Sequence, residues 1–163
     1  FPVLSKVDFG QANFIPGEDP VRFESEVGKF GVLICFESAF SYFARNYVLN
    51  GADILVNITN DGWFGSTRGP KQHAELAILR AVENRVPLYR AANTGISMAV
   101  DPTGRISAKV ELDRPGMILA RSYRGSELSF FCRHGHTTYF VMVAVSLAAA
   151  LLVGVSRKSG LIS

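Results

Sequence analysis

The feature that most constrains the fold is the apolar stretch 30–40, FGVLICFESAF, because it delivers a cysteine into a turn. The short, uninterrupted apolar run 31–34 predicts a strand that is buried on both faces. Ser38 is predicted to cap a helix that follows directly. The apolar face of that helix comprises Phe40, Phe43, Ala44, Tyr47 and Val48. Cys35 is therefore expected at a strand-to-helix elbow, where a side chain can reach a substrate.

Two interpretations of Cys35 follow from this position. As a nucleophile, its thiolate would be favoured by the partial positive charge at the start of the helix. Glu37 opposes that ionisation unless its carboxylate faces elsewhere or is held by a donor. As a structural residue, Cys35 would be buried, since free cysteine is among the most buried residue types. Cys132 lies far away in sequence, so the spacing indicates no zinc or other metal site but leaves a disulfide open as an alternative.

Strands and helices are predicted to alternate along the rest of the chain. The expected strands are 21–24, 52–59, 88–92, 96–100, 106–110 and 117–121. Pro70 is placed as the first residue of a helix that Pro87 closes. Its buried face is expected to comprise Ala74, Ala77, Ile78, Ala81 and Val82. This alternation favours an α/β layered domain, because each crossover helix must cover an apolar face of the sheet.

The segment 138–155 carries no charged residue and is followed by Arg157 and Lys158. Its length and composition predict a transmembrane helix, with a buried core helix as the alternative. The expected organisation is a globular domain over 1–121, a connector over 122–137, the membrane helix over 138–155 and a tail over 156–163. The chain begins at Phe1 without the pattern of a targeting segment, so we expect it to be the C-terminal part of a longer polypeptide.

Length and charge narrow the classes of function. With 163 residues the chain is long enough for one domain with a sizeable core. The net charge is only +3, and the basic residues are scattered among acidic ones. This distribution argues against nucleic acid as a partner and is compatible with binding to a membrane surface.

Three segments in order carry a resemblance to a known family. They are Cys35 with Phe36 and Glu37, then NITNDGWFG at 57–65, then QHAELAILRAVENRVPLYRAANTGIS at 72–97. Together they resemble the nitrilase superfamily of carbon-nitrogen hydrolases, and within it the bacterial family of apolipoprotein N-acyltransferases. The resemblance implies a nitrilase-like αββα sandwich, present here in part. It also implies a place on the periplasmic side of the bacterial inner membrane, in contact with membrane lipid.

The resemblance further implies an acyltransferase reaction without a cofactor. An acyl chain passes from a phospholipid donor to the Cys35 thiol, and then to the N-terminal amine of a diacylglyceryl lipoprotein acceptor. The backbone N–H of Phe36 would contribute to the oxyanion hole, and Glu37 would orient the site. Trp63 and Phe64 match the family's loop near the acyl pocket and would contact lipid chains. The alternatives are a solvated carboxylate for Glu37 and ordinary loop packing for the two aromatic residues.

Other polar residues receive weaker assignments. The family's general-base glutamate and oxyanion-stabilising lysine are expected upstream of residue 1, because Lys6 and Lys29 do not match the family motif. His73, on the polar side of its predicted helix, invites a general-base role that the family does not use. Arg80 and Glu83 are spaced for an ion pair.

Two further functions stay open at this point. One is a membrane-anchored amidase of the same superfamily, in which water reaches the thioester that an acyltransferase must protect. The other is a membrane-anchored binding domain in which Cys35 is inert.

Overall fold

A six-stranded mixed sheet forms the centre of the computed structural model, which describes residues 20–65, 67–121, 127–135 and 137–158. The strands are β1 (Arg22–Ser25), β2 (Gly28–Ile34), β3 (Ile54–Thr59), β4 (Leu88–Ala92), β5 (Ser97–Val100) and β6 (Ile106–Val110). They lie side by side in chain order, with β2, β3 and β4 parallel and the outer strands antiparallel. The α/β prediction is confirmed.

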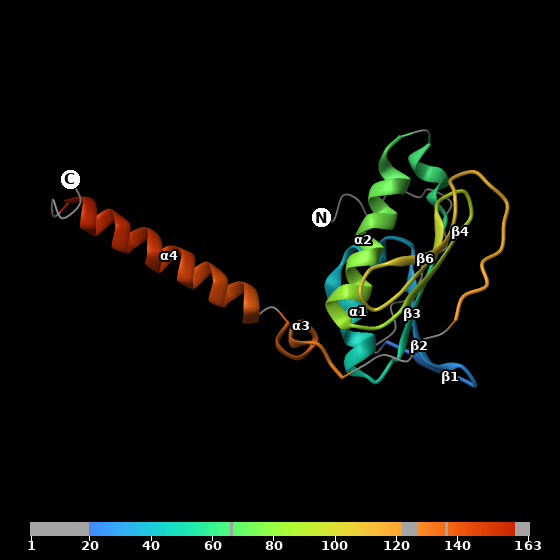
Figure 1. Ribbon diagram of the computed structural model, residues 1–163, viewed down its shortest axis with the longest axis horizontal. Helices are drawn as coiled ribbons and strands as arrows, with labels where there is room; N and C mark the ends of the chain where they lie inside the picture. The colour runs from blue at the N-terminus through green and yellow to red at the C-terminus, as the bar shows by residue number, and fades with distance from the viewer. Residues whose placement is uncertain (1–19, 66, 122–126, 136, 159–163) are drawn as a thin grey trace, which may run out of the picture.

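Two helices connect the parallel strands and cover one face of the sheet (Figure 1). They are α1 (Ser41–Leu49) and α2 (Gly69–Asn84), and Pro70 stands in the first turn of α2 as predicted. Two short 3₁₀ helices follow the ends of strands: η2 (Cys35–Ala39) after β2, and η3 (Asp61–Phe64) after β3. Both therefore lie at the carboxyl edge of the parallel strands, where ligands bind in open α/β sheets.

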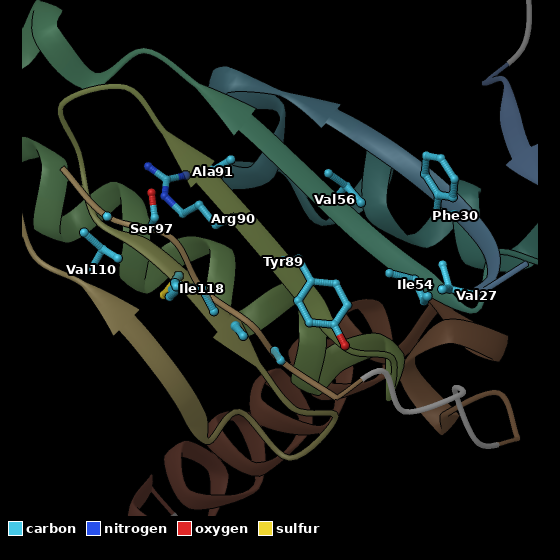
Figure 2. Close-up of a pocket in the computed structure, with 14 residues that line it drawn as sticks. Val27, Phe30, Ile54, Val56, Tyr89, Arg90, Ala91, Ser97, Val110 and Ile118 are labelled. Atoms are coloured by element: carbon cyan, nitrogen blue, oxygen red, sulfur yellow. The ribbon is translucent and has the colours of Figure 1, made fainter. Parts of the chain in front are cut away.

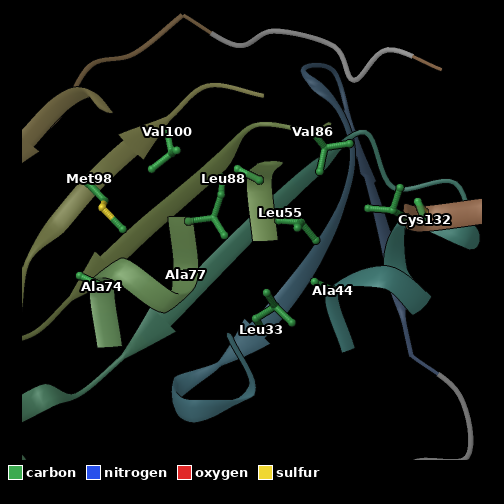
Figure 3. Packing of buried hydrophobic residues seen from close by; sticks show 12 residues of the cluster. Leu33, Ala44, Leu55, Ala74, Ala77, Val86, Leu88, Met98, Val100 and Cys132 are labelled. Atoms are coloured by element: carbon green, nitrogen blue, oxygen red, sulfur yellow. The ribbon is translucent and has the colours of Figure 1, made fainter. Parts of the chain in front are cut away.

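The core lies between this sheet face and the two helices (Figure 3). Leu33, Leu55 and Leu88 come from the three parallel strands and are fully buried. Each contributes about 1.5–3 kcal/mol through removal of its side chain from water. Small residues on the facing side of α2, among them Ala77 and Ala81, are also fully buried and let the helix approach the sheet closely.

The opposite face of the sheet carries an apolar hollow of about 520 Å³ (Figure 2). Successive side chains of a strand point to opposite faces, so neighbours of the core leucines line this hollow. They include Phe30, Ile54, Val56 and Tyr89, and the segment 116–120 borders them. In the part of the chain that the structure describes, α1 and α2 are the helical layer, so the four-layer αββα sandwich stays a prediction.

Two predictions about secondary structure are wrong for the described residues. Ser38 does not cap a long helix, because η2 intervenes and the N-cap of α1 is Phe40. Residues 117–121 run without strand pairing, and Met117 and Leu119 are 83% and 87% exposed. Ile118 and Ala120 of this segment instead line the apolar hollow.

The chain ends in α3 (Phe130–His134) and α4 (Thr137–Lys158), and α4 projects away from the domain (Figure 1). A helix at the predicted place is therefore confirmed. Its apolar side chains, such as Phe140, Leu147 and Leu152, are exposed among the described residues, so α4 does not pack into the core of this domain. Among the described residues, no helix combines the length and the apolarity needed to cross a membrane, so the predicted transmembrane span over 138–155 is not supported.

Candidate active site

Cys35 occupies the elbow that the sequence predicts. It follows β2 directly, begins η2 and has a backbone φ of +50°. A residue other than glycine held in this left-handed region costs about 1–3 kcal/mol, and such strain concentrates at functional sites. Cys35 is a free cysteine and is only partly buried, whereas the structural interpretation expects full burial. Cys132 is free as well, so the disulfide alternative is wrong.

The backbone carbonyl of Cys35 is held by three side chains. Its oxygen lies 3.2 Å from Nδ2 of Asn57, 3.1 Å from Nε2 of His73 and 3.1 Å from Oγ of Ser38. All three side chains are buried. The strained elbow is thus anchored from beneath by polar groups that water does not reach.

A buried charged network extends this anchor. Nδ1 of His73 lies 2.9 Å from Oδ1 of Asp61, and the other carboxylate oxygen of Asp61 accepts a 2.7 Å hydrogen bond from Arg90. Arg90 also donates to the side-chain oxygen of Asn57, which closes the circuit back to the Cys35 carbonyl. Burial lowers the pKa of the Arg90 guanidinium, and the neighbouring Asp61 opposes that shift. Buried charges are tolerated when they are paired and hydrogen-bonded in this way.

The positions of these residues follow from strand register and loop order. Asn57 and Arg90 are direct partners in the β3–β4 ladder and point to the helix-covered face. Asp61 begins η3 just after β3, and His73 lies on the first turns of α2. Four separate elements therefore bring one side chain each to the underside of the Cys35 elbow.

Glu37 is held within the same turn. Its Oε2 accepts a 2.8 Å hydrogen bond from the backbone N–H of Ile34, the residue before the nucleophile candidate. The carboxylate has therefore found a donor, which is the condition under which its charge opposes the Cys35 thiolate less. It also ties the end of β2 to the start of η2.

The aromatic candidates lie around His73 and the elbow. Phe36 is 49% exposed and its ring centroid is 5.4 Å from that of His73. The ring of Phe64 contacts the same imidazole at 5.8 Å, whereas Trp63 is 80% exposed. The structure brings Phe36 and Phe64 together and leaves the Trp63 side chain on the surface.

Several of these residues were not recognised from sequence. The sequence pattern predicts only a helix cap for Ser38, and it predicts no role for Asn57, Asp61 or Arg90. His73 was placed on the polar side of its helix, but it is only 1% exposed, because the carboxylate and carbonyl around it supply polar partners inside the protein. A single polar residue inside each apolar strand, Asn57 in β3 and Arg90 in β4, was the available signal.

One predicted pair is confirmed beside the site. Arg80 and Glu83 form an ion pair at 2.9 Å on α2. Arg80 also donates to the carbonyl of Ala39 at 3.3 Å, which attaches the end of η2 to α2.

The carbon-nitrogen hydrolase family model matches residues 5–125. An apolipoprotein N-acyltransferase of Geobacter metallireducens is 39% identical over 158 residues, which are 97% of this chain and 30% of that protein. A protein of the same description from Agrobacterium fabrum is 46% identical over 114 residues, which are 70% of this chain and 21% of that protein. The chain thus spans less than a third of the length of these relatives.

Solved structures are similar at the level of the fold. A Saccharomyces cerevisiae member of the nitrilase superfamily is 27% identical with a TM-score of 0.52, over 62% of this chain and 40% of that one. An amidase from Nesterenkonia sp. is 26% identical with a TM-score of 0.51, over 63% and 41%. A variant of an amidase from Nesterenkonia sp. AN1 is described with acrylamide added at its active-site cysteine. The sheet and its helices therefore form a nitrilase-like α/β fold.

Proposed function

Because this chain belongs to the carbon-nitrogen hydrolase family, we propose that it is the part of an apolipoprotein N-acyltransferase that carries the nucleophile, Cys35. The observation that carries the proposal is the free, partly exposed Cys35 thiol at a left-handed elbow behind a parallel strand. The Geobacter metallireducens relative described as an N-acyltransferase matches 97% of this chain, a span that includes the elbow, the aromatic loop and α2.

The proposed reaction has two halves. In the first, Sγ of Cys35 adds to the ester carbonyl of a phospholipid, the carbon–oxygen bond breaks, and the proton that the thiol loses passes to the released lysophospholipid hydroxyl. In the second, the N-terminal amine of a diacylglyceryl lipoprotein adds to the thioester, the carbon–sulfur bond breaks and the thiol is restored. The net result is one ester exchanged for one amide, without a cofactor.

Each half passes through an oxyanion that needs hydrogen-bond donors. We assign one donor to the backbone N–H of Phe36, the residue after the nucleophile in the first turn of η2. First-turn N–H groups have no acceptor within their own helix, which suits them to this role. Glu37 supports the elbow through its bond to the Ile34 N–H.

A contact with lipid chains is supported by the aromatic surface near the elbow. Phe36, Phe40 and Phe43 are exposed, and their rings follow one another at 5.7 and 6.3 Å. Trp63 is also exposed. Exposed apolar patches of this kind mark interaction sites for lipid or protein, so we assign acyl-chain contact to Phe36, Trp63 and the adjoining Phe64.

A membrane location follows from the same proposal. The helix α4 exposes apolar side chains along its length and joins the domain through α3. We propose that α4 lies in lipid at the bacterial inner membrane, with the domain over 1–121 on the periplasmic side and 122–137 as the connector. The apolar hollow on the uncovered sheet face supports a second sheet there, as in an αββα sandwich.

The test uses the purified full-length gene product with a diacyl phospholipid and a synthetic diacylglyceryl lipopeptide. We expect the lipopeptide to gain one acyl chain, and Cys35→Ala to abolish the gain. Cys132→Ala is the matched control, because it removes the other cysteine of this chain and should leave transfer intact. Failure of transfer combined with hydrolysis of small amides would favour the amidase alternative, which the likeness to the Nesterenkonia amidase supports.

A further inference from the structure

The peptide group that joins Cys35 to Phe36 is trans and planar. In such a unit the carbonyl oxygen and the following N–H point in opposite directions. The Cys35 oxygen faces the buried side chains of Asn57 and His73. The Phe36 N–H therefore points away from these buried side chains.

We propose that His73 and Asn57 are positioning residues that hold the Phe36 N–H in its oxyanion-binding direction by anchoring the Cys35 carbonyl from beneath. This inference rests on the proposed function, because it concerns the same acylated cysteine. It gives His73 a role different from that of a general base, since its Nε2 bonds to the backbone carbonyl at 3.1 Å.

Buried hydrogen bonds to neighbouring side chains fix the orientation of His73 and Asn57 beneath the Cys35 carbonyl. A proton on Nε2 makes His73 a donor to the Cys35 carbonyl, which is only an acceptor. The other ring nitrogen bonds to Asp61 at 2.9 Å, and this fixes the plane of the imidazole. Arg90 bonds to both Asp61 and Asn57. One buried guanidinium therefore connects Asn57 with His73, the two proposed positioning residues, the latter through Asp61.

The left-handed φ of Cys35 is the reason that the elbow needs these hydrogen bonds. An L-residue in that conformation relaxes to another one unless surrounding contacts hold it. Rotation of the Cys35–Phe36 peptide would turn the carbonyl outward and the Phe36 N–H inward. Loss of the anchor is therefore expected to remove an oxyanion donor while the thiol stays in place.

Two reactions of the same thiol separate this role from a merely structural one. Acylation by an ester forms a tetrahedral oxyanion and needs the Phe36 N–H. Alkylation by iodoacetamide displaces iodide from a saturated carbon and forms no oxyanion. A positioning defect lowers the first rate alone, whereas local unfolding changes both.

The experiment measures both rates at Cys35 in the full-length protein, with p-nitrophenyl butyrate and iodoacetamide as probes and peptide mass spectrometry as readout. His73→Leu removes the donor, and its acylation rate is expected to fall about 100-fold, as when one oxyanion donor is lost. His73→Gln supplies an amide donor in the same region and is expected to recover about tenfold of that loss. Alkylation stays at the wild-type rate in both variants.

Two further variants keep the test decisive if His73→Leu folds poorly. Ser38→Ala removes one of the three donors at little steric cost, and its acylation rate is expected to fall about threefold to tenfold. Asn84→Ala is the matched control, because Asn84 is equally buried on the same helix and bonds only to the Arg80 carbonyl among the contacts described. Both rates of this control should equal those of the wild type.

Each outcome bears on the inference. Equal losses of acylation and alkylation in His73→Leu and Ser38→Ala would overturn it, as would an acylation loss in Asn84→Ala of the same size. Wild-type protein that is alkylated but never acylated by the small ester would overturn it as well. Acylation by the small ester without acylation by phospholipid would instead contradict the proposed function and leave the anchor supported by the variant rates.

Discussion

Gly95→Ala probes the buried network with a single methyl group. A Cβ at position 95 would stand 2.1 Å from Oδ2 of Asp61 and 2.7 Å from its Cγ. Carbon–oxygen contacts settle near about 3.3 Å, so the carboxylate must move by more than about 1 Å. The 2.7 Å bond from Arg90 to that oxygen cannot survive such a displacement.

The expected destabilisation follows from two contributions. Overpacking of a close-packed interior costs about 1–3 kcal/mol, and loss of a hydrogen bond between charged groups costs about 1.5–3 kcal/mol. Together they place Gly95→Ala at about 3–5 kcal/mol, the range for a broken buried ion pair. For a protein of this size or larger we expect the midpoint of thermal unfolding to fall by about 10 °C.

The assay is thermal unfolding of the full-length protein in detergent, followed by far-ultraviolet circular dichroism. Gly154→Ala is the matched control, since it adds the same methyl group to α4, where no atom of the described residues lies within 4 Å of the new Cβ. We expect the control to unfold at the wild-type temperature or slightly above it, because alanine favours a helix. Unfolding of Gly95→Ala together with the wild type would refute the steric reasoning and the tight packing of Asp61.

Two further predictions concern cysteine reactivity and acid stability. Burial raises the pKa of the Cys132 thiol, so the fold favours the neutral thiol. The neutral Cys132 thiol contributes fully to stability below the pKa of the unfolded-state thiol. That contribution is lost as the pH rises through the pKa of the folded-state thiol. Iodoacetamide at neutral pH should therefore label Cys35 and spare Cys132 until the protein is unfolded, and equal labelling rates would contradict this. Hydrogen bonds from Thr103 lower the pKa of Asp101, so its contribution is present above the unfolded-state pKa near about 3.9 and is lost as the pH falls. In Asp101→Asn, the free energy of unfolding measured by denaturant titration should fall less steeply than in the wild type between about pH 5 and 3. An equal slope of unfolding free energy against pH in both proteins would contradict this prediction.

The strands and the nucleophile elbow were predictable because their signals are local. The apolar runs that end at Ile34 and Thr59 became β2 and β3, and the turn before β6 lies where Asp101 and Gly104 placed it. The prediction that Ser38 caps the helix is wrong for a reason that lies outside its own segment. Its hydroxyl bonds to the Cys35 carbonyl instead of capping α1, because the left-handed elbow starts a 3₁₀ turn earlier than the apolar pattern indicates.

The buried network could not be predicted from local pattern, because its members are far apart in the chain. Asn57, His73 and Arg90 meet only through the register of β3 on β4 and the packing of α2 over that sheet. Hydrophobic periodicity treats such residues as interruptions of an apolar face. In the folded protein, contacts between distant parts of the chain give these polar residues hydrogen-bond partners in one buried cluster.

The central claim is that Cys35 carries the acyl group. The most direct measurement is peptide mass mapping of the full-length protein after incubation with a diacyl phospholipid, comparing the tryptic peptides 30–45 and 125–133, which contain one cysteine each. We predict an acyl mass on peptide 30–45 alone, and its disappearance when a lipoprotein amine is added. An acyl mass on peptide 125–133, or on neither peptide while transfer proceeds, would contradict the account.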